Sequence, residues 1–218
     1  MTGGPPGAGA APAGWNARLG YTLAVMVAFD LGMFVAHYLQ HKVPVLWEFH
    51  KVHHSAQVLT PISVFRMHPV DDVLSGVCTA LAIGAVGGVF TWGLGGPVDA
   101  VLVGCVNLGL FLFYIFGYNL RHSHVWLSYP RWLSWLLVSP AQHQIHHSRA
   151  PIHVDKNLGF VFSFWDRMTR TLYVPDKREP LDFGIGHGED EEYDGLTALY
   201  LLPFKKAAGL MPLPLRGR

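Results

Sequence analysis

The chain has 218 residues, half of them apolar, with a formal net charge of +1. Only 14% of its residues are charged, against about 25% in an ordinary soluble domain. This balance predicts one membrane-embedded domain and argues against nucleic-acid binding, which requires a concentrated basic surface. The compositional outlier is histidine, with 13 residues against 15 for aspartate and glutamate together.

Residues 1–17 are rich in Gly, Pro and Ala and are predicted to form a disordered tail. Residues 18–205 are predicted to form the membrane domain and residues 206–218 a C-terminal tail. The first apolar run covers 19–35 and is about long enough to span a bilayer. Its one acid, Asp30, is expected either to pair with a histidine further along the helix or to lie near the interface with a water or hydroxyl partner.

The segment 37–70 is amphipathic and holds six of the histidines. Two further apolar runs follow, 73–92 and 98–118, joined by the short uncharged turn GLGGP. This pattern predicts a helical hairpin through the membrane. The expected fold class is therefore all-α, a polytopic membrane helical bundle with a cytosolic histidine-rich helical cap.

An even number of predicted crossings separates the histidine-bearing segments, so three spans would gather them all at one membrane face. Only Arg18 precedes the first span, whereas the other fifteen Lys and Arg residues follow His41 and none lies in the turn at 93–97. The positive-inside rule then predicts that the histidine face is cytoplasmic.

The histidines follow a spacing that favours metal binding. The pattern H-x-x-H-H occurs twice, and one H-x-x-x-H pair precedes it; on a helix, residues three and four apart share a face. Eight to ten imidazoles are too many for one ion and suit two, and neutral imidazole binds Zn, Fe, Cu and Ni. The predicted metal ligands are His37, His41, His50, His53, His54, His122, His124, His143, His146 and His147. Candidate acceptors that would orient these rings are Glu48, Asp71, Asp155 and Asp166.

Three other interpretations compete with this one. Single histidines often decorate a membrane interface, and for His68, His153 and His187, which lie outside the motifs, that reading is preferred, although the turn at His68-Pro69 is expected near the first clusters. A membrane zinc hydrolase would use the same ligands. A metal transporter or haem-b carrier would need ligands inside the spans, whereas these cluster just past span ends.

Five segments together closely resemble the fatty acid hydroxylase superfamily, which includes sterol desaturases, sphingolipid and fatty acid hydroxylases and alkylglycerol monooxygenase. They are HYLQH (37–41), WEFHKVHHS (47–55), FRMHP (65–69), RHSHVWL (121–127) and SPAQHQIHHS (139–148). The segment DKNLGFVFSFWDRMTRTLYVP (155–175) is similar to the closing segment of the family.

The resemblance implies an integral-membrane, non-haem di-iron oxygenase that uses O2 and two electrons to hydroxylate or desaturate a lipid. Its two irons would be held by His37, His41, His50, His53, His54, His143, His146 and His147. His122 matches the additional family ligand best, and His124 falls where many members have Asn. No haem or flavin module is fused to the chain, so the electrons would come from a separate donor, a cytochrome b5-like protein, a ferredoxin or a reductase.

Overall fold

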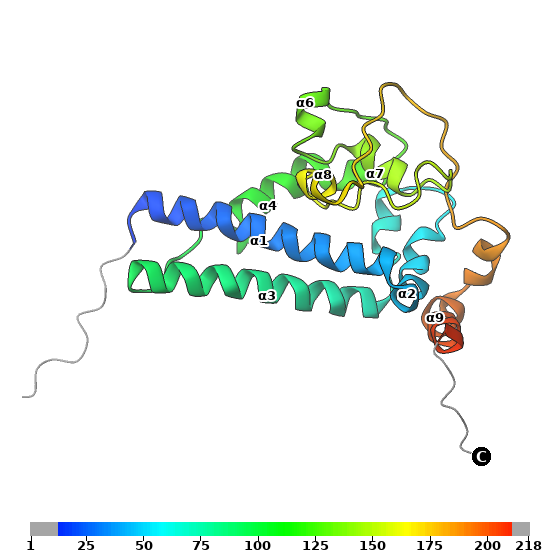
Figure 1. Cartoon of the computed structure of the whole chain (residues 1–218), viewed down its shortest axis with the longest axis horizontal. Helices are drawn as coiled ribbons and strands as arrows, with labels where there is room; N and C mark the ends of the chain where they lie inside the picture. The colour runs from blue at the N-terminus through cyan, green and yellow to red at the C-terminus, as the bar shows by residue number, and fades with distance from the viewer. Residues whose placement is uncertain (1–12, 211–218) are drawn as a thin grey trace, which may run out of the picture.

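The computed structural model describes residues 13–210, and two antiparallel helices set its long axis. Helix α1 (Trp15–Lys42) and helix α3 (Pro69–Leu94) lie side by side along most of their length (Figure 1). Within the described range, these are the two helices long and apolar enough to cross a membrane. The remaining elements gather mainly at the end of the pair where α1 finishes and α3 begins.

The contact between α1 and α3 depends on a glycine. A Cβ atom added to Gly32 would lie 2.5 Å from the Cα atom of Thr79, so only a glycine lets the two backbones approach this closely. The opposite face of α3 exposes large apolar side chains, among them Leu81 at 70% and Trp92 at 88%. Such a surface is suited to lipid rather than water.

The third apolar run, 98–118, does not form the single spanning helix that its hydropathy predicts. It contains a short hairpin of β1 (Leu102–Val103) and β2 (Val106–Asn107), then α4 (Leu108–Phe113), a π-helical turn η2 (Tyr114–Tyr118) and α5 (Asn119–Arg121). The turn at Gly104 and Cys105 has left-handed backbone angles, with φ of 54° and 68°. The Asn107 side chain then accepts hydrogen bonds from the amides that open α4.

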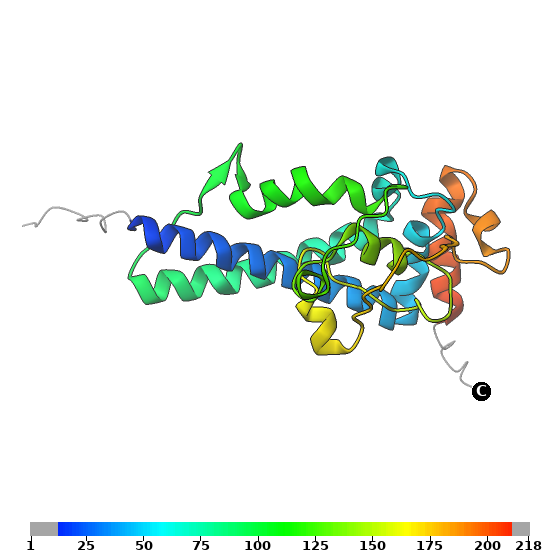
Figure 2. The ribbon, with the colours of Figure 1, turned by 90° about the horizontal axis from the view of Figure 1, so that it is seen from above.

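The returning segment nevertheless leads back to the expected end of the molecule. In Figure 2, α4 and the helical turns after it run beside α1 toward the cap. The chain therefore reaches His122 at the same end where α1 delivers His37 and His41.

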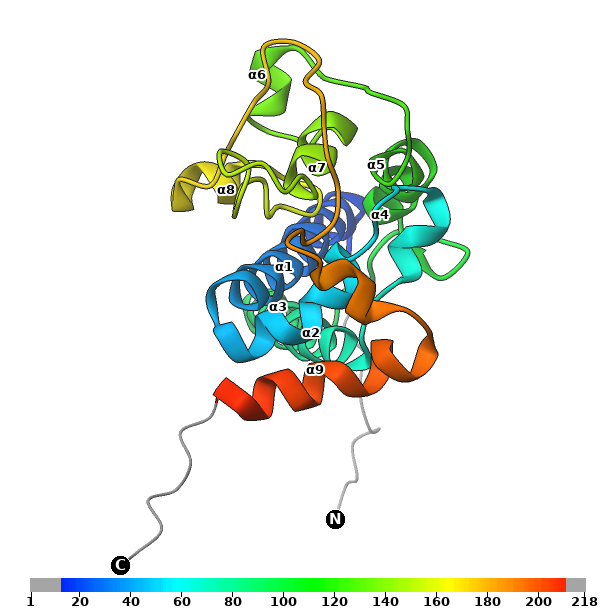
Figure 3. The same cartoon turned by 90° about the vertical axis from the view of Figure 1, so that its right-hand side faces the viewer.

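The cap consists of helices gathered around the C-terminal half of α1. They are α2 (Pro44–His54), η1 (Pro61–Phe65), α6 (Arg131–Ser134), α7 (Pro140–His146), α8 (Phe164–Thr169), η3 (Glu189–Tyr193) and α9 (Leu196–Leu210). Helix α9 is seen end-on in Figure 1 and along its length in Figure 3, so it runs across the axis of α1 and α3. It packs against α2.

The predicted domain boundaries differ slightly from the observed helix ends. Helix α1 begins at Trp15, inside the segment expected to be a disordered tail, and α9 continues past residue 205 to Leu210. The rest of the predicted tails falls largely on residues 1–12 and 211–218, outside the described residues.

Asp30 anchors the cap to the middle of α1. It is fully buried and accepts hydrogen bonds from the amides of Val161 (2.6 Å) and Phe162 (3.1 Å) and from Nε1 of Trp165 (2.9 Å). None of these three donors is a histidine or a hydroxyl group, which were the protein partners expected for it. Because three donors satisfy one buried carboxylate, the segment around residue 161 is held against the helix.

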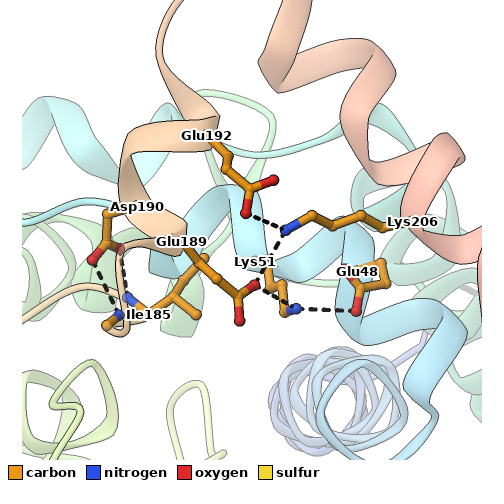
Figure 4. Close-up of polar contacts among 8 residues, drawn as sticks. Glu48, Lys51, Ile185, Glu189, Asp190, Glu192 and Lys206 are labelled. Atoms are coloured by element: carbon orange, nitrogen blue, oxygen red, sulfur yellow. Dashed lines mark hydrogen bonds and ion pairs between the residues drawn. The ribbon is translucent and has the colours of Figure 1, made fainter.

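A network of charged side chains holds α2, η3 and α9 of the cap together (Figure 4). Lys51 of α2 donates to Glu48 (3.0 Å) and to Glu189 of η3 (2.9 Å). Lys206 of α9 donates to Glu189 and Glu192, both at 3.2 Å. These ion pairs join α2, which carries three of the histidines, to η3 and α9.

Candidate metal centre

Nine of the ten histidines predicted as ligands lie in two groups, each with one nitrogen per ring within 4.8 Å of the others. We call the first group cluster A; its members are His37, His41, His50, His54 and His146. The second is cluster B; its members are His53, His122, His143 and His147. The tenth histidine, His124, is exposed and lies in neither cluster.

The two H-x-x-H-H motifs are divided between the clusters in opposite ways. In α2, His50 and His54 belong to cluster A and His53 to cluster B. In the motif that α7 carries, His143 and His147 belong to cluster B and His146 to cluster A. Each motif thus sends its i, i+4 pair to one cluster and its third ring to the other.

Local sequence features place these helices. Pro44 starts α2 and Pro140 starts α7, each in the first helical turn where its missing N–H costs nothing. Ser139 and Gln142 form a capping box at the start of α7, with the serine Oγ accepting from the Gln142 amide and the Gln142 side chain accepting from the Ser139 amide. The helix therefore begins at a defined residue and delivers its histidines in register.

In cluster B the four Nε2 atoms converge on one point. Nε2 of His122 lies 3.3 Å from that of His53, 3.1 Å from that of His147 and 3.2 Å from that of His143. Nitrogens bound to one metal at ~2.1 Å would be separated by about 3.0 Å at right angles and about 3.4 Å in a tetrahedron. The observed spacing is that of donors around a single ion.

In cluster A most Nδ1 atoms face a hydrogen-bond acceptor, whereas most Nε2 atoms face none among the described residues. Nδ1 faces an oxygen in four rings: His37 with Leu158 O (2.7 Å), His41 with Asp155 (3.2 Å), His50 with Asp71 (3.2 Å) and His146 with Lys156 O (2.9 Å). The buried Nε2 atoms of His41, His50, His54 and His146 have no hydrogen-bond partner within residues 13–210. Nitrogens oriented in this way and left unpaired fit a metal ion.

Burial keeps the cap histidines neutral, as metal ligation requires. Burial away from water lowers the pKa of His50 and His53 to about 3 and that of His122 to about 2. It also holds the pKa of His54, His143, His146 and His147 well below the ordinary value. At neutral pH each of these rings retains an unprotonated nitrogen.

His143 differs from the other rings in what faces its Nδ1 atom. Nη2 of the buried Arg121 donates to it over 2.7 Å, and Arg121 also donates to Phe160 O and Gly159 O. Because arginine is only a donor, Nδ1 of His143 carries no proton. A metal bound at Nε2 would replace the one proton that this ring keeps.

Of the four candidate acceptors, two face a histidine ring and two have other partners. Asp71 and Asp155 orient His50 and His41, whereas Glu48 binds Lys51, and Asp166 accepts from Leu158 N, Gly159 N and Thr171 Oγ1. The other acceptors are backbone carbonyls, which carry no sequence signal.

Two histidines outside the motifs make structural contacts. Nδ1 of His68 accepts from Val70 N at the start of α3, and its Nε2 bonds Tyr200 O of α9. His153 lies between Ser148 Oγ and Glu179, at 3.0 Å from each. Both rings hold the cap together away from the two clusters.

Two hollows of opposite character reach the clusters. An apolar cavity of about 90 Å³ touches both of them, and its other lining residues include Met33, Met67, Tyr118 and Phe160. A more polar pocket of about 330 Å³ is lined by four cluster histidines together with Trp47 and Asp155. The site is thus accessible from an apolar side and from a polar side.

Known proteins are similar to this chain in sequence. The ornithine lipid hydroxylase OlsE of Rhizobium tropici is 27% identical over 175 residues, covering 80% of this chain and 48% of that protein. Alkylglycerol monooxygenase of Xenopus tropicalis is 27% identical over 163 residues, 72% of this chain and 31% of that protein. Human cholesterol 25-hydroxylase is 28% identical over 162 residues, 71% of this chain and 52% of that protein.

The chain thus spans about half or less of the length of these relatives. No solved structure is significantly similar to it. The fatty acid hydroxylase family profile matches residues 22–171, which include both H-x-x-H-H motifs and every member of clusters A and B. The chain belongs to the fatty acid hydroxylase family.

Proposed function

We propose that this protein is an integral-membrane, non-haem di-iron oxygenase that uses O2 and two electrons to hydroxylate or desaturate a lipid. The observation that carries the proposal is the pair of adjacent buried clusters built entirely from histidine. The family match and the lipids named in its relatives support a lipid substrate. In the hydroxylation case, R–H, O2, two electrons and two protons give R–OH and water.

We assign one iron to cluster A and one to cluster B. Zinc in proteins is almost always held by four ligands or fewer, whereas cluster A offers five imidazole nitrogens. Five nitrogen donors favour an ion that accepts five or six ligands, as iron does. His124 is left out of the ligand set because its exposed ring lies away from both clusters.

The metals would supply the O2 activation that no side chain can perform. The chain's own residues do the rest. Asp71, Asp155 and the carbonyls of Leu158 and Lys156 fix the orientation of cluster A rings. The apolar cavity beside the clusters excludes water and holds the lipid segment that is to be oxidised.

We further propose that the histidine end of the molecule is cytoplasmic, since fifteen of its sixteen Lys and Arg residues follow the first span. A separate carrier, such as a cytochrome b5-like protein, a ferredoxin or a reductase, would then deliver electrons there. Such a carrier would approach the centre at the polar pocket beside Trp47, which differs from the apolar lipid cavity in its lining.

The test is O2-dependent lipid oxidation by the purified, iron-loaded full chain with an electron donor, set beside the same chain stripped of metal. Product formation that requires iron, O2 and reductant is expected. A metal-free protein that stays active would overturn the proposal. Zinc-dependent hydrolysis without O2 would favour the hydrolase alternative, and a Soret band in the purified protein would favour a haem carrier.

A further inference from the structure

Helix α9 exposes an apolar face although it belongs to the cap. Within residues 13–210, Leu201 is 61% exposed, Phe204 53% and Tyr200 49%. Leu201 and Phe204 are three residues apart and share one face of the helix, with the exposed Thr197 a turn before them and the exposed Ala208 a turn after. The helix contains no acidic residue. A helix that faces water on this side would carry charged residues there.

The charged contacts of α9 lie on its opposite face. Lys206 donates to Glu189 and Glu192 of η3, both at 3.2 Å. At about 100° per residue, the Lys206 side chain points about 160° away from Phe204 and about 140° away from Leu201. One face of α9 thus joins the rest of the cap through ion pairs, and the other exposes apolar side chains.

The apolar face lies on the side of α9 where α3 begins. The ring of His68, the N-cap residue of α3, packs against Phe204 and Tyr200 with centroid separations of 5.3 and 6.1 Å. From His68 onward α3 exposes its own apolar residues, beginning with Val73 at 67% and Val77 at 52%. The exposed face of α9 therefore adjoins the lipid-facing surface of α3.

The direction of α9 fits a membrane surface. The helix is seen end-on in Figure 1 and along its length in Figure 3, so it runs across the axis of α1 and α3. With α1 and α3 across the bilayer, α9 lies in the plane of the membrane surface, as interfacial helices do. Tyr200 is of the aromatic type that is enriched at this level. Lys205, exposed beside Phe204, is long enough to extend its amine to lipid phosphates.

We propose that α9 is a membrane-surface helix whose face with Leu201 and Phe204 rests on the lipid bilayer beside α3. The apolar side chains contact the boundary of the acyl chains, and Lys205 lies among the phosphates. Helix α9 packs on α2, where the rings of Phe204 and Phe49 lie 5.0 Å apart between centroids. The bilayer therefore also fixes the height at which α2 holds its three histidines above the membrane.

The test measures the surroundings of single spin labels on the full chain in phosphatidylcholine nanodiscs. The labels are attached at Leu201→Cys on α9 and at Glu191→Cys on η3, in a chain that carries Cys78→Ala and Cys105→Ser. Molecular oxygen concentrates in lipid and a neutral nickel chelate in water, so the ratio of their collision rates reports contact with lipid. We expect a severalfold higher ratio at position 201 than at position 191. A label at Leu81→Cys on α3 supplies the reference for lipid.

A second measurement uses a label at Ala208→Cys, on the same face of α9. Adding Leu201→Glu should lower the ratio at this label, whereas adding Glu191→Gln should leave it unchanged. Equal ratios at positions 201 and 191 would overturn the inference, because the face would then contact water. Magnetic coupling between the position 201 labels of two chains would overturn it too, because a second copy would then cover the face. The comparison of positions 201 and 191 stands even where Leu201→Glu does not fold, and it requires no iron.

Discussion

The imidazole rings of His54 and His147 stack with their centroids 4.6 Å apart and their planes at 29°. His54 belongs to cluster A and His147 to cluster B, so rings of the two clusters are in direct contact. A second contact between the clusters joins His146 and His147 edge to face, with ring centroids 5.1 Å apart and planes at 79°. The two proposed metals are therefore neighbours within one buried centre rather than two separate sites.

Because each H-x-x-H-H motif contributes rings to both clusters, the structure predicts which substitutions weaken binding of the same metal. His146→Ala should weaken metal binding in cluster A, together with His54→Ala, although its sequence neighbours belong to cluster B. Each substitution is expected to weaken metal binding more than the about 10–100-fold that loss of an orienting partner costs. Metal affinities from chelator competition provide the measurement.

A double-mutant cycle separates this arrangement from a simple one-motif, one-metal scheme. His146→Ala combined with His54→Ala should be strongly non-additive, and His146→Ala combined with His143→Ala closer to additive, because coupling is expected between ligands of one ion. The reverse pattern would show that each motif serves its own metal. His124→Ala is the control and should leave both affinities unchanged.

Removing an orienting carboxylate should weaken metal binding without removing a ligand. Asp71, which is 1% exposed, fixes Nδ1 of His50. We expect Asp71→Ala to lower metal affinity about 10–100-fold. The exposed neighbour Asp72 supplies the control on the same helix. Equal metal affinities for Asp71→Ala and Asp72→Ala would contradict the orienting role.

The close contact of α1 and α3 should not tolerate a methyl group. Gly32→Ala is expected to lower the free energy of unfolding by about 1–3 kcal/mol, because the added Cβ meets the backbone at Thr79. At Gly20 nothing lies within 4 Å of the added atom, so Gly20→Ala should be neutral or slightly stabilising. Denaturant unfolding in detergent micelles measures both, and a stable Gly32→Ala protein would mean that the helices lie further apart.

The ion pairs around Glu189 predict an acid-sensitive contact between α2, η3 and α9. The hydrogen bond from Lys51 lowers the pKa of Glu189 below its ordinary value of 4.5. A carboxyl group of this kind stabilises the fold above pH 4.5, and that stabilisation is lost as the pH falls through the lowered pKa.

Glu189→Gln should therefore have a lower Tm than the wild type at pH 7, and the difference should shrink as the pH falls below that value. Glu191→Gln, a change at an exposed neighbour of the same turn, is the control. A difference in Tm that stays constant from pH 7 down to acid would show that the Glu189 charge does not contribute.

The sequence was informative where spacing alone determines geometry. Two H-x-x-H-H motifs on helices must present their rings in groups, and the returning apolar run brings His122 to the same end as His37. The division of each motif between two clusters was not predictable in the same way. It depends on how α2 and α7 are rotated about their axes, which is decided by the packing of α2 against α1 and α9 and of α7 against α5.

Other features could not be predicted from the sequence, for different physical reasons. Hydropathy does not distinguish one long helix from a hairpin followed by short helices, so the left-handed turn at Gly104 and Cys105 was missed. Asp30 was expected to meet a histidine or a water or hydroxyl group, but its partners are two amides and Trp165, more than 130 residues away in sequence. Gln40 stands inside the motif HYLQH, and nothing in its spacing shows that this residue lines the cavity.

The most direct test of the central claim is the metal content of the purified full chain after expression with iron. We expect about two irons per chain, the number that two histidine clusters of this size imply. His146→Ala and His53→Ala, which each remove one ring from a different cluster, should both lower that number. One metal per chain in the wild type, or none in a protein that still oxidises lipid, would contradict the account.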